Sequence, residues 1–335
     1  MKNSRQKLLL FLILCFILCG SQVVKIKTVN NDYTENKDFN PGPNYEQYHT
    51  NDTAVYGNYN ERGYEMENTK TKDYSERLYR IDLVRKYLSE FEFIEKGRIG
   101  ISFYCLTTQK GVGINEDEYF FSASTIKMPT HMMLAERISV GDLSWEKELT
   151  VYHTDWLEGS GVLKDQLNIG DKITVYNALY HSIKYSDNLA HRMITRTVIP
   201  GFTHEQFGLD NSNWDLTRTI FNRYLGGPVV TGRMQVTPNQ LTELFKILYR
   251  EKDNYEGYQT IINMMKESFW TDRFKTNLTS GIVAHTPGWT TPYEHDSGIF
   301  FTEQPYILVV YTYDIPDAIE LISYISDQVF RILTR

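Results

Sequence analysis

The feature that most constrains the fold is the order of helix and strand patterns between residue 76 and the C-terminus. Apolar residues recur at helical spacing over residues 76–91, and two alternating segments, 97–106 and 111–121, flank a polar turn as in an antiparallel hairpin. Helical patterns fill the middle. Two further strand patterns, 297–303 and 306–314, precede a final helical pattern. This order predicts one α+β domain of about 260 residues whose sheet joins both ends of the region.

The N-terminal residues 1–21 have the layout of a secretory signal, with a basic start, an apolar stretch over 8–18 and small residues at the end. We therefore expect an exported protein, secreted or anchored on the extracytoplasmic side. An uncleaved membrane anchor through residues 1–24 is the alternative, although a confident span needs about 18 apolar residues. Cys15 and Cys19 each follow leucine rather than the small residue that normally precedes a lipid-modified cysteine, which argues against a lipoprotein.

Residues 22–75 are rich in Asn, Tyr, Glu and Thr and contain almost no Leu, Ile or Phe. Such a segment cannot bury enough apolar surface to offset about 1–2 kcal/mol of backbone entropy per residue. We expect a disordered tether. The alternative is a small tyrosine-rich surface module.

Charge and cysteine content exclude several other classes. The net charge of −7 argues against a surface for nucleic acid or anionic membrane, because either would favour a basic face. Beyond the signal, Cys105 is the sole cysteine, so no internal disulfide can form and core packing must provide the stability. We expect a monomer that needs no cofactor.

The stretch FSASTIKMPTHMML places Ser124 three residues before Lys127 at the start of an amphipathic helical pattern. In a helix the two side chains would be neighbours on one face, and the amides of the helix N-terminus would favour negative charge. This suits acyl transfer, provided that the lysine is neutral and can accept the serine proton. Lowering its pKa to about 7–8 requires burial. However, Ser-x-x-Lys occurs three times in this chain, and serine is also a common helix cap.

Two downstream segments supply the context that the motif alone lacks. YSDN carries Ser186 and Asn188 between two helical patterns, 62 residues after Ser124, and AHTPGW begins 98 residues after Ser186. In this order the three segments, with the flanking GSGVLK, resemble the penicillin-recognising serine hydrolases, specifically the class A β-lactamase-like family. The signatures of that family are Ser-x-x-Lys, Ser-Asp-Asn and Lys-Thr-Gly. The resemblance covers residues 76–335.

The resemblance implies a β-lactamase/transpeptidase-like α+β fold, with a sheet of about five antiparallel strands, flanking helices and an all-helical subdomain. It implies that Ser124 is the acylated nucleophile and Lys127 its proton acceptor. Ser186 would relay the proton to the leaving nitrogen, and Asn188 would hold the substrate amide. The oxyanion hole would be the backbone N–H groups of Ser124 and Trp289. A β-lactam or a peptidoglycan-like cell-wall peptide would be the substrate.

The third motif departs from the family pattern, because AHTPGW replaces Lys-Thr-Gly. If Gly288 is the motif glycine, Thr286 takes the place of the lysine and no cation remains. If the motif is shifted by one residue, His285 stands for the lysine, Thr286 keeps its role and Pro287 replaces the glycine. We favour the second register and expect His285, Thr286 and Gly288 to contact the substrate. In both registers the usual anchor for a substrate carboxylate is weakened, and Pro287 favours an edge strand.

The second departure concerns deacylation. Class A β-lactamases carry a glutamate, followed four residues on by asparagine, in the loop after Ser-Asp-Asn, whereas no Asp or Glu lies between Asp215 and Pro238 here. General-base assistance is typically worth about 100- to 10,000-fold. We therefore expect a serine hydrolase that is acylated but turns β-lactams over slowly. The alternatives are a catalytically degenerate binding protein and a genuine β-lactamase with a non-standard base.

The remaining histidines receive structural interpretations. We expect His131, about one turn beyond Lys127, to be packed or solvated rather than catalytic. His295 and Asp296 are interpreted as a turn that leads into a strand. They are not interpreted as a metal site, because no Cys, His or carboxylate cluster accompanies them at ligand spacing.

Overall fold

The computed structural model describes residues 62–199, 212–225 and 234–334. The predicted signal sequence lies outside the described residues, and so does the predicted tether up to residue 61. None of the helices in the described ranges is both long and apolar enough to cross a membrane.

The predicted end of the tether at residue 75 is wrong, because residues 62–75 form the first half of helix α2 (Arg62–Leu88). The second half is anchored by apolar residues buried under the sheet, and extending an existing helix costs much less than starting one. An ion pair between Arg77 and Asp73 (2.8 Å) connects the two halves at i,i+4 spacing, and a second between Arg80 and Glu76 (2.8 Å) stabilises the start of the second half. The helical pattern predicted over 76–91 is confirmed by α2 and by the short 3-10 turn η2 (Ser89–Phe91) that follows.

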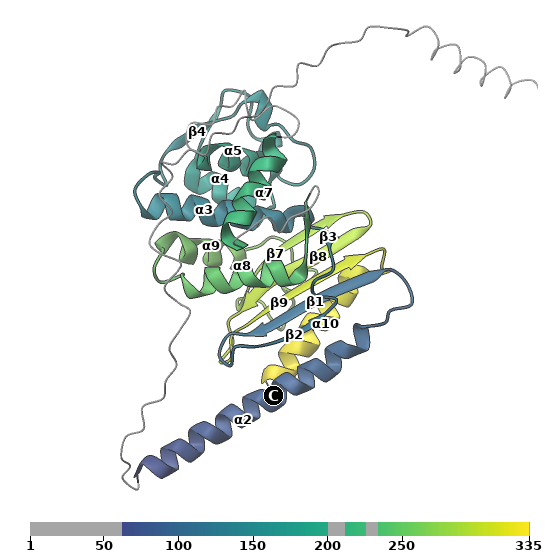
Figure 1. The fold of residues 1–335 in the computed structure, drawn as a ribbon. Helices are drawn as coiled ribbons and strands as arrows, with labels where there is room; N and C mark the ends of the chain where they lie inside the picture. Colours follow the sequence, from purple (N-terminus) through teal and green to yellow (C-terminus); the bar gives the residue numbers. More distant parts are fainter. Residues whose placement is uncertain (1–61, 200–211, 226–233, 335) are drawn as a thin grey trace, which may run out of the picture. The chain divides into compact units, whose positions relative to one another are not determined.

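The central sheet has five antiparallel strands in the order β2-β1-β9-β8-β7, which confirms the α+β class and the sheet that joins both ends of the domain (Figure 1). The C-terminal strand β9 lies between the N-terminal strand β1 and β8, with Arg98 opposite Tyr313 and Cys105 opposite Tyr306. Both faces of β9 are covered, which explains its nearly continuous apolar sequence YILVVYTY. The strands are β1 (Arg98–Cys105), β2 (Lys110–Ile114), β7 (Val283–Thr290), β8 (Tyr293–Phe300) and β9 (Tyr306–Tyr313).

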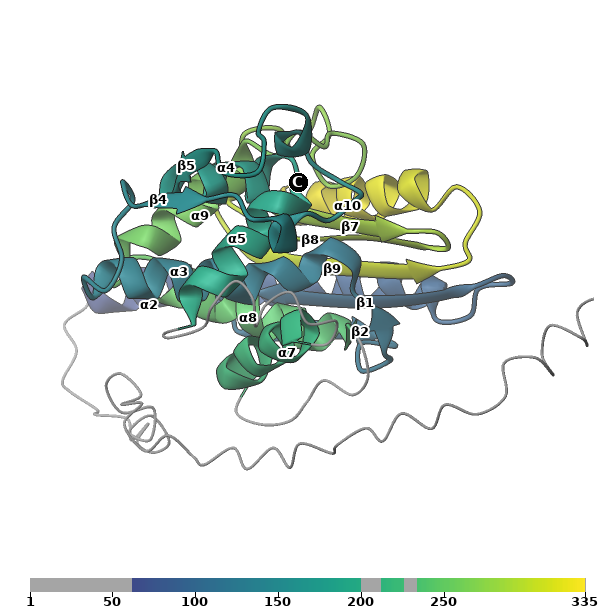
Figure 2. The same ribbon diagram turned by 90° about the horizontal axis from the view of Figure 1, so that it is seen from above.

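The two faces of the sheet are covered by different sets of helices (Figure 2). Helices α2 and α10 (Ala318–Thr334) cover one face and enclose a core that includes Ile81, Phe103 and Ile325. Helices α8 (Pro238–Arg250) and α9 (Glu256–Lys266) cover the other face. That second core continues into the helical part of the domain.

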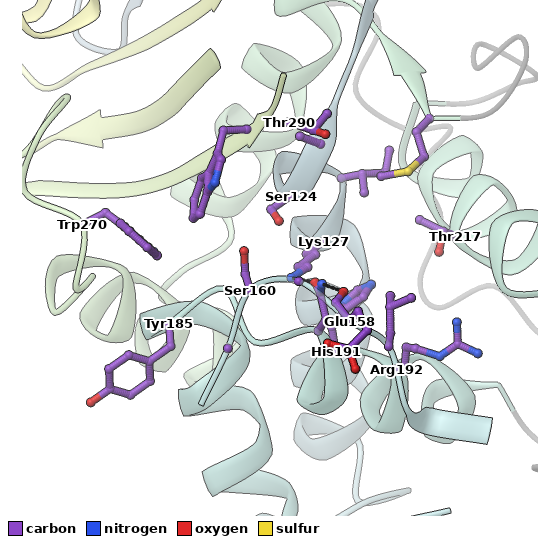
Figure 3. Close-up of a pocket in the computed structure, with 18 of the residues that line it drawn as sticks. Ser124, Lys127, Glu158, Ser160, Tyr185, His191, Arg192, Thr217, Trp270 and Thr290 are labelled. Carbon is purple, nitrogen blue, oxygen red and sulfur yellow. Dashed lines mark hydrogen bonds between the residues drawn. The ribbon is translucent and has the colours of Figure 1, made fainter. Parts of the chain in front are cut away.

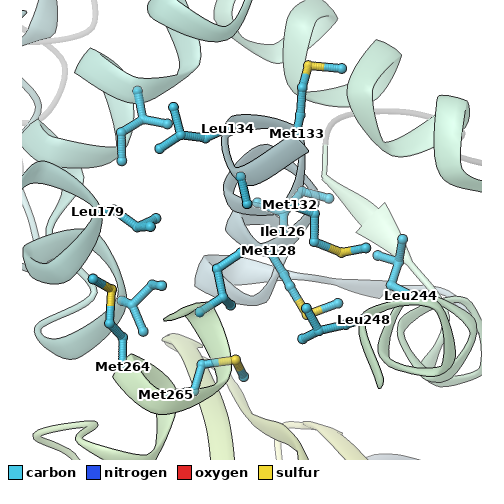
Figure 4. Close-up of a cluster of buried hydrophobic side chains, with 14 of the residues drawn as sticks. Ile126, Met128, Met132, Met133, Leu134, Leu179, Leu244, Leu248, Met264 and Met265 are labelled. Atoms are coloured by element: carbon cyan, nitrogen blue, oxygen red, sulfur yellow. The ribbon is translucent and has the colours of Figure 1, made fainter. Parts of the chain in front are cut away.

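The helical part is built around α3 (Met128–Ser139), which is buried over its first eight residues, Met128 to Ala135. Figure 4 shows Met128, Met132, Met133 and Leu134 projecting from it towards the surrounding helices. Apart from the small two-stranded sheet of β4 and β5, this subdomain is helical, as predicted. Its other elements are α4 (Val175–Lys184), α5 (Asn188–Val198), α7 (Ser212–Leu225), β4 (Glu148–Thr150) and β5 (Lys172–Thr174).

The second strand of the predicted hairpin is shorter than expected. β2 ends at Ile114, and Phe120–Phe121 forms a separate strand, β3, that pairs with β6 (Gln235–Val236). The Ser122 N–H then donates to the Met234 carbonyl at 2.7 Å. This attachment fixes the chain immediately before the Ser-x-x-Lys segment.

Candidate active site

Ser124 lies in a 3-10 turn, η3 (Ala123–Lys127), that precedes helix α3. The sequence predicted a helix at this point, but the α-helix begins only at Met128. The turn is closed by Thr125, whose N–H and hydroxyl both donate to the Ser122 carbonyl, at 3.2 and 2.8 Å. Ala123 adopts a left-handed φ of 45°, which is uncommon for a residue with a Cβ. Ser124 is thereby placed in the lining of a cleft.

Lys127 is buried, with 6% of its surface exposed. Its ammonium nitrogen donates to the Ser186 carbonyl at 2.6 Å and to the Asn188 Oδ1 at 2.8 Å, and it lies 3.3 Å from the Ser186 hydroxyl. Desolvation lowers the pKa of Lys127 from its ordinary value of 10.5 to about 7, although the nearby Asp187 carboxylate raises it. The structure therefore brings two of the predicted site residues, Ser186 and Asn188, into contact with a lysine that is largely neutral above pH 7.

Asp187 fixes the loop that carries Ser186 and Asn188. One carboxylate oxygen accepts the N–H of Ala190 (3.0 Å) and caps helix α5, whereas the other accepts the N–H groups of Val162 (2.7 Å) and Leu163 (2.8 Å). Gly161 permits this approach, because it has a φ of 125° and a Cβ there would collide with the Asp187 carboxylate. The GSGVLK segment is thus bound to the Ser-Asp-Asn loop by backbone donors.

Both polar atoms of the Asn188 side-chain amide form hydrogen bonds. Its Oδ1 accepts from Lys127, and its Nδ2 donates to the Glu158 carbonyl at 2.9 Å. The backbone N–H of Asn188 donates to the Ser160 carbonyl at 2.9 Å. A Cβ at Gly159 would lie 2.8 Å from Asn188 Nδ2, so a glycine is required there as well. The amide is oriented before any substrate arrives.

Strand β7 contacts the Ser124 turn through Gly288. A Cβ at this position would lie 3.0 Å from the backbone nitrogens of Ser124 and Thr125, so a larger residue would force the strand and the turn apart. Because side chains alternate along a strand, Thr286 shares the face of Gly288 and His285 points to the other face. This favours the register in which Gly288 is the motif glycine.

The predicted role of His285 in substrate binding is wrong. His285 is fully buried, and its Nδ1 lies 2.8 Å from the Asp296 carboxylate, which also accepts the backbone N–H of Phe274 at 3.0 Å. The sheet therefore separates His285 from Ser124. Pro287 lies on β7, the edge strand of the sheet, as predicted. An edge strand tolerates a residue without a backbone N–H.

The other histidines have structural roles. His131 Nε2 lies 2.8 Å from the Ser182 hydroxyl, and burial lowers the pKa of His131 to about 3. Of the two predicted alternatives, packed or solvated, the structure shows a packed side chain. His295 and Asp296 do not form a turn: both are buried within β8, where the His295 Nε2 contacts the Phe121 carbonyl at 2.7 Å. Within the described ranges, no group of three His, Cys, Asp or Glu side chains is placed to hold a metal.

Four of the candidate site residues line a cleft of about 850 Å³ (Figure 3). Its lining includes Ser124, Lys127, Asn188 and Trp289, which follows Gly288 on β7. The sequence did not predict the contribution of His191, one turn after Asn188 on α5. The i,i+3 spacing of these two residues was the available signal.

Few charged side chains reach the cleft. Among the described residues of the lining they are Lys127, Glu158 and Arg192, and none of them lies on β7. Glu158 is exposed and pairs with Lys164 at 2.6 Å, which lowers the pKa of the carboxyl group, and Arg192 donates to the Thr154 carbonyl. Burial keeps the pKa of His191 well below its ordinary value, so this imidazole is neutral.

Comparisons with known proteins agree with this geometry. The profile of the β-lactamase enzyme family matches residues 83–333. The chain is 22% identical over 201 residues to β-lactamase VEB-1 of Pseudomonas aeruginosa, covering 58% of this chain and 67% of that protein. The TLA-3 extended-spectrum β-lactamase superposes with a TM-score of 0.64 at 19% identity, over 76% of this chain and 99% of the other. PBP-A superposes with a TM-score of 0.63 at 18% identity, over 75% and 95%. The chain belongs to the β-lactamase enzyme family and has the fold of its serine hydrolases.

Proposed function

We propose that the protein is an exported serine hydrolase that is acylated at Ser124 by an amide or ester, such as a β-lactam or a cell-wall peptide. The observation that carries the proposal is the buried Lys127, with a pKa of about 7, bonded to Ser186 and Asn188 beside a cleft that Ser124 lines. A scaffold that only binds ligands needs no neutral lysine in this position. Family membership supports the same reaction class.

The hydrogen bonds of Lys127 fit a proton acceptor. A neutral amine has two N–H groups and one lone pair. The two shortest contacts, to the Ser186 carbonyl and the Asn188 Oδ1, take both N–H groups. The lone pair is then available to a hydroxyl, either Ser186 Oγ at 3.3 Å or Ser124 Oγ when substrate binds.

Acylation follows from this arrangement. Ser124 Oγ attacks the carbonyl carbon while its proton passes to Lys127, and the backbone N–H groups of Ser124 and Trp289 stabilise the oxyanion. Ser186 Oγ then takes the proton from Lys127 and gives its own to the leaving nitrogen as the carbon–nitrogen bond breaks. The product is an ester between Ser124 and the acyl group.

We further propose that this ester is hydrolysed slowly when the substrate is a β-lactam. Glu158 is the carboxylate that lines the described part of the cleft, and its exposed side chain pairs with Lys164. A carboxylate in that setting is a weak base. One mutant of PBP-A is described as an acyl-enzyme complex with penicillin G, which supports a β-lactam as a probe for this chain.

A fluorescent penicillin tests the proposal. The full chain should show a burst of one label per protein followed by slow release, and Ser124→Ala should remove the label. The matched control is Ser144→Ala, which alters another Ser-x-x-Lys motif, on an exposed loop, and should label like the wild type.

Three results would contradict the proposal in different ways. Labelling of Ser124→Ala would exclude Ser124 as the nucleophile. Absence of label on the wild type would favour a binding protein without catalysis. Rapid turnover would refute the missing-base argument and would direct attention to His191, whose buried Nδ1 has no hydrogen-bond partner among the described residues.

A further inference from the structure

Four aromatic side chains form a continuous wall on one side of the cleft, and we name Tyr185, Phe269, Trp270 and Trp289 the aromatic wall. Successive ring centroids are 5.8, 5.4 and 4.4 Å apart, which is the spacing of interacting rings. Figure 3 shows Trp270 and Tyr185 on one side of Ser124, with the α5 and α7 side chains opposite. Phe269 is 59% exposed, so its ring is accessible to a ligand in the cleft.

The wall is fixed in place before a ligand binds. The Phe269 N–H donates to the Lys184 carbonyl at 2.9 Å, which ties the segment after α9 to the end of α4. The guanidinium of Arg273 lies 5.4 Å from the ring centroid of Trp289. Arg273 is itself buried and paired with Asp272 and Glu294. A preorganised surface loses little entropy when it binds a flat ring.

Among the described residues that line the cleft, no cation comes from β7 or from the segment that carries Phe269 and Trp270. The two positions before Gly288 are Thr286 and Pro287, and the charged side chains in the described lining lie on other elements. Burying a carboxylate against aromatic rings is costly when no cation pairs with it.

We propose that the aromatic wall is a specificity subsite for an uncharged substrate whose acyl group carries a flat apolar ring. This inference rests on the proposed function, because the ring is held beside the carbonyl that Ser124 attacks. It narrows the substrate from any amide or ester to a neutral aromatic acyl derivative, and it excludes a carboxylate as the main recognition element.

Four small thioesters test the subsite. Phenylacetyl and acetyl groups are each joined to thioglycolate, which is negatively charged, or to its neutral amide. Thiol release by the full chain is followed colorimetrically. The neutral phenylacetyl compound should have the highest kcat/KM, about tenfold above the neutral acetyl compound, because ring stacking contributes on this scale. It should also exceed its charged counterpart.

Variants assign the preference to the wall. Phe269→Ala and Trp270→Ala should each lower several-fold the ratio of kcat/KM for the neutral phenylacetyl thioester to kcat/KM for the neutral acetyl thioester. Phe93→Ala is the matched control, since Phe93 is also an exposed phenylalanine but lies outside the cleft, and it should change neither rate. Equal losses for both compounds would show a structural defect and overturn the assignment.

A binding measurement separates this inference from the proposed function. Binding of the thioesters to Ser124→Ala can be followed by tryptophan fluorescence. The neutral phenylacetyl thioester should bind about tenfold more tightly than the neutral acetyl thioester and than the charged phenylacetyl thioester. If this preference is present but the wild type is never acylated, the subsite stands and the hydrolase proposal fails. Tighter binding of the charged compound, or of an N-acetylglucosamine disaccharide, would refute the subsite.

Discussion

Replacing Lys127 by Met should change how the stability of the protein depends on pH. The wild-type lysine is protonated in the unfolded chain below pH 10.5 but is largely neutral in the folded protein above pH about 7. Between these values the unfolded state binds one more proton, so the free energy of unfolding of the wild type rises with pH by about 1.4 kcal/mol per pH unit. Methionine does not titrate, so the variant lacks this rise.

The magnitude follows from the same pKa values. At pH 7, burial of Lys127 costs the folded state about 4 kcal/mol relative to a neutral side chain. Methionine removes this cost but leaves the Ser186 carbonyl and the Asn188 Oδ1 without their donor, at about 1–3 kcal/mol each. The two effects partly cancel at neutral pH. From pH 7.5 to 10, however, the variant should lose about 3 kcal/mol relative to the wild type.

Urea unfolding of both proteins at several pH values between 6 and 10 measures this difference, and it needs no knowledge of the substrate. Other titrating groups are common to the two proteins and cancel. Lys147→Met is the matched control, because Lys147 belongs to the Ser144 motif and is exposed, so its effect should not vary with pH. A constant difference between wild type and Lys127→Met would refute the conclusion that burial makes the lysine neutral.

Three further outcomes are expected. The rate of labelling by fluorescent penicillin should rise about tenfold per pH unit up to pH about 7 and then level off, because only neutral Lys127 accepts the proton. Stopped-flow measurements would show this rise, and a rate that does not change with pH would contradict it. Gly161→Ala should destabilise the protein in urea by about 1–3 kcal/mol more than Gly170→Ala, because both glycines have positive φ but only the first would collide with the Ser-Asp-Asn loop. Asp155→Asn should lower the stability measured by thermal melting by about 3 kcal/mol, since it breaks a buried pair with an arginine of α5, whereas Glu148→Gln, in an exposed pair, should cost under about 1 kcal/mol.

The sequence predicts the fold well where side-chain periodicity reflects burial. The apolar run of β9 and the helical repeats of α2 and α10 were recognised because each pattern records which faces are covered. The start of α2 was missed, because residues 62–75 carry no apolar stripe and become helical as an extension of the anchored segment after them.

The site was predicted less completely because its geometry depends on contacts between distant segments. The left-handed Ala123 and the 3-10 turn around Ser124 follow from the close packing of Gly288, which is far away in the sequence. The face on which His285 lies depends on its partner Asp296 in the next strand. A single sequence offers two registers for AHTPGW, and the pairing with β8 distinguishes them.

The aromatic wall left no recognisable signal in the sequence. Tyr185 comes from the end of α4, Phe269 and Trp270 from the segment after α9, and Trp289 from β7. Isolated aromatic residues in three separate segments are indistinguishable from core residues until the fold brings them together.

The position of β9 between β1 and β8 has a consequence for how the protein matures. The Ser-x-x-Lys and Ser-Asp-Asn segments are synthesised in the first two thirds of the chain, but the sheet that supports them cannot close until residues 306–313 have entered it. Pairing of such distant segments is a slow step in folding. A nascent or truncated chain that ends before β9 would therefore contain Ser124 and Lys127 but no assembled cleft, so the proposed acylation would become possible only after residues 306–313 have been synthesised.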